Sequence, residues 1–401
     1  MAAKRALIFS LVYYPDFIGG AELAVKEITD RIAPDDIEFH MMTLRTGAEP
    51  TIAKIGNITV HRIGFRAAAG PLLVANKYLF PFMAACRASR LNKVGAFDFT
   101  WAIMANYAGF AALFFKIFHM NIPFVLTLQE GDPIEYILGR TRIVSRLFRM
   151  IFTHADRIQA ISRYLADFAR NMAARAKKDV ADRTVVVPNG VDVDRFSRFV
   201  IGGELEAIRR EIGKKPGDVF LVTASRLVTK NAVGDIVAAL RFLPENVRLL
   251  IIGKGELESS LRAQAKSLGL MDAAPRVIFK GFIPHEDLPK YLQACDIFVR
   301  PSLSEGFGNS FIEAMAAGLP VIATPVGGIV DFLRDKETGL FCEIGSPADI
   351  ARKAEIYIRD KSLRDEIIDN ALHMVVDHYD WKIVARDMRE KVFEPVLSLR
   401  S

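Results

Sequence analysis

Cysteine is scarce in this sequence, with three residues in 401. Cys86, Cys295 and Cys342 have no paired spacing and belong to no Cys/His cluster, so neither a disulfide framework nor a cysteine-based zinc site is expected. We therefore predict a reducing, cytoplasmic setting in which each cysteine is buried for structural reasons.

A long apolar run is also missing. The longest uncharged stretch, 99–115, has 17 residues, contains polar positions and falls at the short limit of a membrane span. It divides better into a strand (FTWAIM) and a helix (NYAGFAALFFKIF). The N-terminal segment MAAKRALIFSLVYYP holds only a short apolar run that flows into a polar loop, so we predict a first strand rather than a signal peptide.

Acidic residues are nearly absent from one segment, because residues 51–129 contain eight basic residues and one acid, Asp98. Residues 1–198 hold 26 basic and 18 acidic side chains, whereas 199–401 hold 27 and 29. This asymmetry predicts an anionic partner for the first half. Nucleic acid fits poorly despite a pI of about 9.1, because basic and aromatic residues are not interleaved.

Apolar, β-branched segments alternate with helical patterns along the chain. The expected strands are RALIFSLVYY, IEFHMMTL, ITVHRIGF, FTWAIM, PFVLTLQ, RIQAIS and TVVVP, then VFLVTAS, VRLLIIG, VIFKGF, IFVRPS, VIATP and GLFCEI. Strands that are hydrophobic on both sides belong to parallel sheets covered by helices. We predict an α/β protein of two Rossmann-like, doubly wound domains, 1–198 and 199–380, with a C-terminal helix, 381–401, that could pack back on the first domain. Ligands of such sheets bind beyond the carboxyl ends of the strands, so the cleft between the domains is the expected active site.

The stretch SEGFGNSFIEAMAAGLP places Glu305 on a glycine-containing loop and Glu313 in the helix that follows. Ser310 could cap that helix, with Glu313 as the fourth residue of a capping box. The capping box does not explain Glu305 or the glycines, which let backbone approach a ligand, while the helix N-terminus attracts anions. Carboxylates beside an anion site predict a ligand that carries hydroxyl groups, such as a sugar joined to a phosphate.

The spacing of Glu305 and Glu313 resembles the Glu-(seven residues)-Glu motif of the family-four, or group 1, retaining glycosyltransferases, which have the GT-B fold. The likeness extends over nearly the whole chain and is densest from about residue 184 to 345. It implies that Glu313 holds the ribose hydroxyls of the nucleotide and that Glu305 lies near the donor sugar. The same resemblance implies that sugar and phosphates face the following residues: Gly306, Phe307, Gly308 and Asn309.

Arg226 and Lys230 lie in SRLVTKN, which follows the strand VFLVTAS and is expected to open a helix. A solvated helix start explains them, although positive charge there is mildly unfavourable for the helix dipole. Alternatively, two fixed cations stabilise negative charge on a departing nucleoside diphosphate without a metal. They resemble the diphosphate-binding pair of the family, with one residue fewer between them than the commonest family spacing.

Two motifs of the first half also resemble the family. Gly19 and Gly20, in PDFIGGAELAVKEI, either form a tight turn or present backbone N–H groups to a phosphate. Gln129, in TLQEGDP, stands where many relatives have a histidine that contacts the transferred sugar; glutamine cannot take a proton, so no general-base role is carried over. The nearby carboxylates Glu130 and Asp132 either orient the acceptor or serve in capping and turns.

Three further matches are softer. PNGVD resembles the segment before the interdomain linker and puts Asn189 near the ligand, although an ordinary Asn-Gly turn also explains it. Ile283, in GFIP, stands where relatives place backbone against the base. Arg300 is an unusual charge at the end of a buried strand and is expected to face the nucleotide.

Two basic segments of the first half are either solvated helix faces or contacts with anionic lipid headgroups. Their basic residues are Arg142, Arg146 and Arg149 in one segment and Arg87, Arg90 and Lys93 in the other.

We therefore expect a cytoplasmic enzyme that moves a hexose from a nucleotide-diphosphate sugar, UDP in preference to GDP, to a hydroxyl of a glycan or lipid-linked acceptor, with no metal or other cofactor. Arg226, Lys230 and Glu305 would act in catalysis, and the first domain could touch the inner face of a membrane. A GT-B nucleotide-sugar epimerase and a non-catalytic nucleotide-sugar-binding protein share the same expected fold and anion sites.

Overall fold

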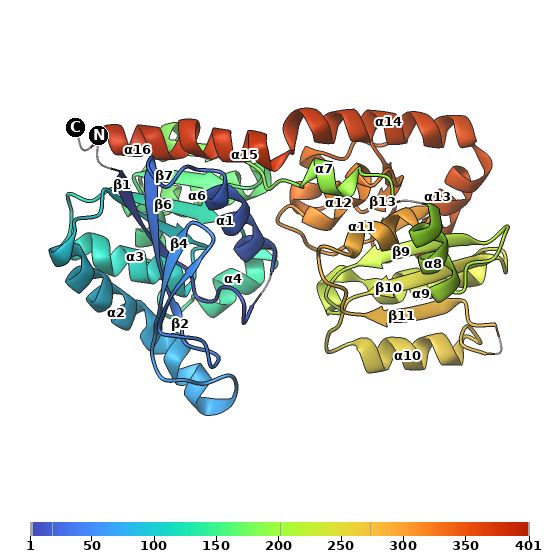
Figure 1. Ribbon diagram of the computed structural model, residues 1–401, viewed down its shortest axis with the longest axis horizontal. Helices are drawn as coiled ribbons and strands as arrows, with labels where there is room; N and C mark the ends of the chain where they lie inside the picture. The colour runs from blue at the N-terminus through green and yellow to red at the C-terminus, as the bar shows by residue number, and fades with distance from the viewer. Residues whose placement is uncertain (1–2, 18, 201, 273, 400–401) are drawn as a thin grey trace. The chain divides into compact units, whose positions relative to one another are not determined.

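The structure, a computed structural model, describes residues 3–17, 19–200, 202–272 and 274–399. The chain forms two compact units (Figure 1). Unit 1 comprises Met1–Asn189 and Trp381–Ser401, and unit 2 comprises Gly190–Asp380. The division lies between Asn189 and Gly190 rather than near residue 198, because Val191 pairs with Asp380 and α7 (Val193–Phe196) packs on α12 (Asn309–Ala316), both within unit 2.

Unit 1 contains an eight-stranded sheet in the order β3-β4-β2-β1-β5-β6-β7-β8. Its strands are β1 (Lys4–Phe9), β2 (Ile37–Leu44), β3 (Ile52–Ile55), β4 (Ile58–Ile63), β5 (Phe99–Ile103), β6 (Phe124–Leu128), β7 (Arg157–Ala160) and β8 (Thr184–Val186). All neighbouring pairs are parallel except β3 and β4. Every strand expected in the first half is present, although the first ends at Phe9 rather than Tyr14, and β3 was not predicted.

Helices cover this sheet on both faces, as its double-sided hydrophobic strands require (Figure 1). The helices of unit 1 are α1 (Gly20–Asp30), α2 (Gly70–Val94), α3 (Tyr107–Phe118), α4 (Ile134–Arg140), α5 (Ser145–His154), α6 (Arg163–Ala174), α15 (Trp381–Met388) and α16 (Glu394–Ser398). The last two belong to unit 1 because Trp381 of α15 and Val396 of α16 enter a core that also contains Phe39 and Trp101. The first unit is therefore completed by residues from the end of the chain.

Unit 2 contains a six-stranded parallel sheet in the order β11-β10-β9-β12-β13-β14. Its strands are β9 (Val219–Ala224), β10 (Val247–Ile252), β11 (Val277–Gly281), β12 (Ile297–Arg300), β13 (Val321–Ala323) and β14 (Leu340–Phe341). Its other helices are α8 (Gly202–Glu211), α9 (Val233–Ala239), α10 (Glu258–Ser267), α11 (Leu288–Gln293), α13 (Pro347–Arg359) and α14 (Lys361–His378). The predicted fold class, two doubly wound α/β units, is confirmed. Within the described ranges, no helix combines the length and apolar character needed to cross a membrane.

Candidate functional site

The candidate donor site lies at the point where the sheet of unit 2 changes direction. The chain forms β9 first, adds β10 and β11 on one side, and then adds β12 on the other. Ligands of open α/β sheets bind beyond the carboxyl ends of the strands at such a point. Arg226 follows β9 and Glu305 follows β12, so the topology brings two predicted site residues to neighbouring strand ends.

Glycine, and not Ser310, precedes the helix that carries Glu313. Helix α12 begins at Asn309, and its N-cap is Gly308, with φ 95° and no side-chain capping bond. A Cβ atom on Gly308 would lie 2.6 Å from the Phe311 ring, so this position requires glycine. The alternative in which Ser310 and Glu313 form a capping box is wrong, because the Ser310 Oγ instead accepts a hydrogen bond from Arg300 Nη1 at 2.8 Å.

The Glu313 carboxylate is held by a histidine that sequence reasoning missed. His285 Nε2 lies 2.9 Å from Glu313 Oε1, and the Glu313 side chain is 7% exposed. Arg195 Nη1 lies 3.5 Å from His285 Nδ1. These contacts fit the neutral tautomer in which Nε2 donates to Glu313 and Nδ1 accepts from Arg195. His285 directly follows the predicted GFIP segment, but its partner Glu313 lies 28 positions further along the sequence, so the motif did not reveal the contact.

Glu305 is bound by the neighbouring Arg300. Arg300 Nη2 pairs with Glu305 Oε2, both side chains are 10% exposed, and the Gly306 N–H donates to Glu305 Oε1 at 3.2 Å. The Glu305 backbone is also fixed, since the Gly328 N–H donates to its carbonyl at 3.1 Å. A Cβ atom on Gly327 (φ 55°) would lie 1.9 Å from the same carbonyl, so this close approach requires glycine.

The segment with Arg226 and Lys230 is a loop, not the start of a helix as predicted. Only Thr229–Asn231 forms a 3₁₀ turn, and α9 begins at Val233. Arg226 is exposed and Lys230 is half-buried. The unfavourable interaction with a helix dipole is therefore absent, and the two cations lie on a loop beyond the end of β9.

The remaining predicted residues of unit 2 divide into core and surface. Phe307 is buried against Phe332 and Tyr379, with ring centroids 5.1 and 5.7 Å away, so only its backbone can face a ligand. Ile283 is buried, whereas Asn309 is half-buried at the start of α12. Contact between a nucleotide and any of these residues stays a prediction.

Unit 1 brings Gln129 and Asn189 together. The Asn189 Nδ2 donates to Gln129 Oε1 at 3.3 Å, and both side chains are buried. No turn forms at Asn189-Gly190, so the Asn-Gly turn expected as an alternative is wrong. Gly19 is the N-cap of α1 and Gly20 its first residue, while Ile18 lies outside the described residues.

Glu130 follows Gln129 and joins the ends of two strands. Its Oε1 accepts a hydrogen bond from the Ala105 N–H at 2.6 Å, and its Oε2 is buried without a hydrogen-bond partner in the described structure. Burial raises the pKa of Glu130 to about 7, although nearby backbone N–H groups act in the opposite direction. A carboxyl group that can carry a proton near neutral pH therefore lies beside Gln129, which cannot.

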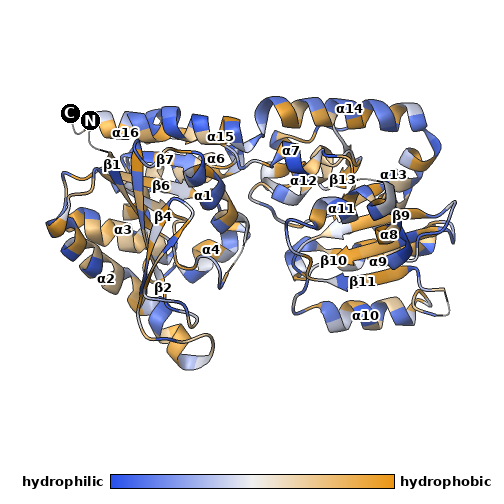
Figure 2. Cartoon of the chain, in the orientation of Figure 1, coloured by the Kyte–Doolittle hydropathy of each residue, from blue (hydrophilic) through white to orange (hydrophobic). Residues whose placement is uncertain are grey.

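The predicted basic segments lie on different helices of unit 1. Arg142 precedes α5, so only Arg146 and Arg149 belong to that helix. The other segment is on α2, where Arg87, Arg90 and Lys93 lie in the second half of the helix. The first half carries exposed apolar side chains, namely Leu72, Val74, Tyr78, Leu79 and Phe82. The adjacent α3 is also largely hydrophobic (Figure 2).

Cys86 is exposed on α2, so the prediction that every cysteine is buried is wrong for this one and holds for Cys295 and Cys342.

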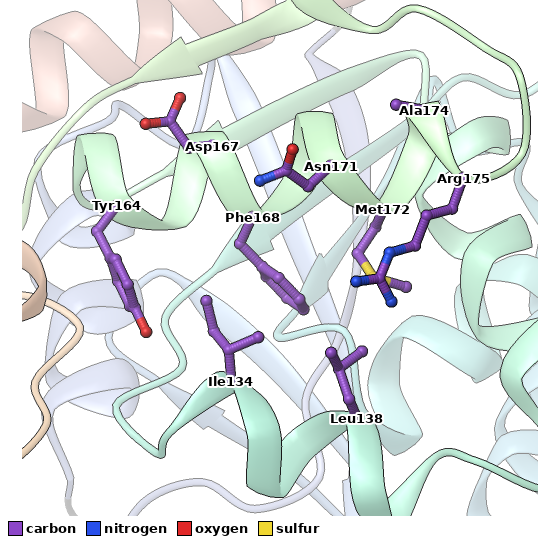
Figure 3. Close-up of a pocket in the computed structure, with 9 residues that line it drawn as sticks. All are labelled: Ile134, Leu138, Tyr164, Asp167, Phe168, Asn171, Met172, Ala174 and Arg175. Atoms are coloured by element: carbon purple, nitrogen blue, oxygen red, sulfur yellow. The ribbon is translucent and has the colours of Figure 1, made fainter.

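A surface pocket of about 650 Å³ separates α4 from α6. Ile134 and Leu138 of α4 face Phe168 and Met172 of α6, and Arg175 lies at one end (Figure 3). None of the predicted site residues line it. The strand ends that carry Arg226 and Glu305 are therefore separate from this pocket.

Comparisons with known proteins agree with this geometry. The family described as Glycosyltransferase Family 4 matches residues 18–195, and the family described as Glycosyl transferases group 1 matches residues 205–374. The chain is 24% identical over 383 residues to N-acetyl-alpha-D-glucosaminyl L-malate synthase of Bacillus anthracis, covering 93% of each chain. A shorter similarity, 28% over 208 residues, covers 51% of this chain and 53% of the uncharacterized glycosyltransferase MJ1607 of Methanocaldococcus jannaschii.

Among solved structures, Anabaena Alr3699/HepE in complex with UDP and glucose superposes with a TM-score of 0.77 at 20% identity, covering 97% of this chain and 99% of that one. That likeness identifies the fold as GT-B. The two family matches, which together span most of the sequence, show that the chain belongs to the family-four, group 1 glycosyltransferases.

Proposed function

We propose that this protein is a retaining glycosyltransferase that moves a hexose from a UDP-sugar to a hydroxyl group of an anionic glycan or lipid-linked acceptor. One observation carries the proposal: Glu305 and Glu313 are both buried next to the N-terminus of α12, and each is oriented by a nitrogen partner of its own. Buried carboxylates are costly unless their hydrogen bonds are satisfied, so their retention here fits a ligand rich in hydroxyl groups.

In this proposal unit 2 binds the donor. Glu313 accepts hydrogen bonds from the ribose hydroxyls, and His285 fixes the orientation of its carboxylate. Glu305 and the backbone of Gly306–Gly308 face the transferred sugar. Arg226 and Lys230 stabilise the negative charge that builds on the diphosphate as it departs, which is the electrostatic contribution that most often dominates enzymatic rate enhancement. No metal ion is required for that step, and the departing diphosphate can accept the proton of the acceptor hydroxyl.

Unit 1 would bind the acceptor. Its excess of basic residues favours an anionic partner, and the name of one relative, N-acetyl-alpha-D-glucosaminyl L-malate synthase, includes malate, which is an anion. We also propose that α2 contacts anionic membrane, because its exposed apolar side chains precede a basic stretch on the same helix. A second copy of the chain is less suited to this surface, since like charges on two copies would repel.

A binding screen by thermal shift tests the donor site. UDP, GDP and ADP would be compared on wild type, Glu313→Ala and Glu366→Ala, the last being an exposed glutamate of unit 2. A ligand present at a hundred times its Kd stabilises the folded state by about 2.7 kcal/mol. We expect UDP to stabilise wild type and Glu366→Ala but not Glu313→Ala. Equal responses in all three proteins would contradict the proposed ribose contact.

Product analysis tests the reaction. With UDP-glucose, release of UDP should require an acceptor, and the anomeric configuration of the product should match that of the donor. UDP release without transfer to any acceptor would point to an epimerase or a hydrolase. Binding without turnover would point to a non-catalytic protein.

Vesicle sedimentation tests the membrane contact. Wild type should bind vesicles of phosphatidylglycerol and phosphatidylcholine more tightly than vesicles of phosphatidylcholine alone. Phe82→Ser should lose most of this binding, whereas Phe199→Ser, at an exposed phenylalanine of unit 2, should retain it. Concentration-dependent dimerisation that Phe82→Ser abolishes would instead assign the α2 surface to self-association.

A further inference from the structure

Asn231, which neither the sequence motifs nor the family matches single out, closes the loop that carries Arg226 and Lys230. It is buried at the end of the 3₁₀ turn Thr229–Asn231. Its Nδ2 donates to the Arg226 carbonyl at 2.7 Å, while its Oδ1 accepts from Arg300 Nη2 at 2.9 Å. A single carboxamide therefore connects the Arg226 loop to the last residue of β12.

Arg300 extends this connection to the segment that carries Glu305. Its Nη2 also pairs with Glu305, its Nη1 donates to Ser310 Oγ at 2.8 Å, and its guanidinium lies 5.3 Å from the Phe311 ring centroid. We call Asn231, Arg300, Glu305 and Ser310 the Arg300 cluster. The Arg300 side chain is 10% exposed and both terminal nitrogens of its guanidinium are bonded to protein side chains, so its charge is directed inward rather than toward a ligand.

We propose that Asn231 and Arg300 are positioning residues that hold the diphosphate-binding loop and the Glu305 loop in one fixed arrangement. This inference rests on the proposed function, in which Arg226, Lys230 and Glu305 act on the same donor. The backbone supports the same connection, since the Leu303 N–H donates to the Lys230 carbonyl at 2.7 Å. This backbone bond joins the two loops, and the side chains of the Arg300 cluster add further hydrogen bonds between the same two loops.

The chemistry of the cluster requires these two residue types. The planar guanidinium can bind a carboxylate, a carboxamide and a hydroxyl group at once, whereas a lysine ammonium is a single point charge without that fork. Asparagine supplies a donor to one loop and an acceptor to the other. An aspartate at position 231 would keep the bond to Arg300 but place two acceptor oxygens against each other at Arg226.

The test compares Asn231→Asp and Arg300→Lys with a matched control, Asn246→Asp. Asn246 also donates through its Nδ2 to a loop carbonyl, that of Gly217, at 2.7 Å, but it is exposed. Displacement of catalytic groups by about 1 Å can lower rates on the order of 100-fold. We expect kcat to fall roughly 10- to 100-fold in both cluster variants, while the Kd for UDP changes by less than about threefold and Asn246→Asp behaves as wild type.

Hydrogen–deuterium exchange provides a readout that does not depend on turnover. Asn231→Asp should accelerate exchange in peptides covering 303–309, and Arg300→Lys should accelerate it in peptides covering 225–232. Acceleration confined to the segment that carries the substitution would overturn the coupling, as would an unchanged kcat in a folded variant. If wild type transfers no sugar at all, the proposed function fails, and the exchange experiment still decides whether the two loops are coupled.

Discussion

Glu130 illustrates how burial sets the properties of a single side chain. Its carboxyl group is held against the Ala105 N–H, and its second oxygen has no hydrogen-bond partner in the described part of the chain. The charged form is therefore poorly solvated, which is why the pKa rises to about 7. The sequence left open whether Glu130 orients an acceptor or serves in capping and turns; the structure shows its contact with the Ala105 N–H, and a role toward an acceptor stays a prediction.

The raised pKa makes unit 1 less stable at higher pH. Because the folded state holds the Glu130 proton more tightly than the unfolded state, stability should decrease as pH rises from about 4.5 to about 7 and then level off. Glu130→Gln removes this titration, so at pH 8 the variant should be more stable than wild type by up to roughly 3 kcal/mol, and the gain should shrink toward pH 5.

Urea unfolding followed by tryptophan fluorescence measures this effect. The two tryptophans, Trp101 and Trp381, are both in unit 1, so the signal reports that unit. Glu135→Gln, at an exposed position on α4, is the control. A gain for Glu130→Gln that is equal at pH 5 and pH 8 would rule out the proton as its cause.

Site residues were predictable where a motif has fixed spacing and unpredictable where partners come from distant segments. Glu305 and Glu313 could be identified because both lie in one continuous stretch. His285 and Asn231 could not, since their roles depend on contacts across 28 and 69 positions in the sequence. Arg300 could be recognised as unusual, but only the structure shows that its guanidinium binds other side chains.

At the scale of elements, a histidine pair joins β2 to β4. His40 Nδ1 lies 3.2 Å from His61 Nε2, and the two rings stack with centroids 5.5 Å apart. Glu38 and Arg5 contact His40 Nε2, and the charge of Arg87 acts on His61. Burial, with the neighbouring positive charges, lowers the pKa of His61 to about 4.

This pair should weaken unit 1 in acid. The unfolded state binds the His61 proton more readily, so stability should be lost as pH falls from about 6.5 to about 4, by up to roughly 3 kcal/mol. We call this loss of stability below about pH 6.5 the acid limb. His61→Gln should make it less steep in urea unfolding experiments that are followed by tryptophan fluorescence. His154→Gln, which replaces a histidine whose ring contacts Thr153 and Met150 of its own helix, is the control. An identical acid limb in all three proteins would assign it to other groups.

Hydrophobic patterns predicted some elements of the fold and missed others. Strands such as β2 and β6 were predictable because all of their positions except Glu38 are buried, which gives a strong apolar pattern. The edge strand β3 was missed because its sequence, IAKI, is only four residues long, too short for a clear strand pattern; in the structure these residues are exposed or half-buried. The boundary of the units was misplaced because the polar stretch after VVVPNGVDVDRF resembles a linker, although α7 already packs within unit 2.

At the scale of the whole molecule, the chain end completes the first unit. Phe393 packs against Phe39, Phe99 and Trp101, with ring centroids 5.1 to 6.3 Å apart. Phe393→Ala should therefore destabilise unit 1 by roughly 3–5 kcal/mol. Phe118→Ala, at a position that is 79% exposed, should change its stability by less than about 0.5 kcal/mol. Urea unfolding followed by tryptophan fluorescence measures both variants, and a small loss of stability in Phe393→Ala would contradict this packing.

Truncation after Asp380 tests how far each unit depends on the terminal helices. It removes all of α15 and α16 from the core of unit 1. The Val191–Asp380 pairing and the carboxylates of Glu305 and Glu313 stay in place in unit 2. The shortened chain should therefore bind UDP with nearly wild-type affinity while trypsin degrades residues 1–189 and spares a fragment that begins near residue 190. Loss of UDP binding would mean that the donor site requires unit 1. Resistance of both units to trypsin would mean that the terminal helices contribute little to the core they enter.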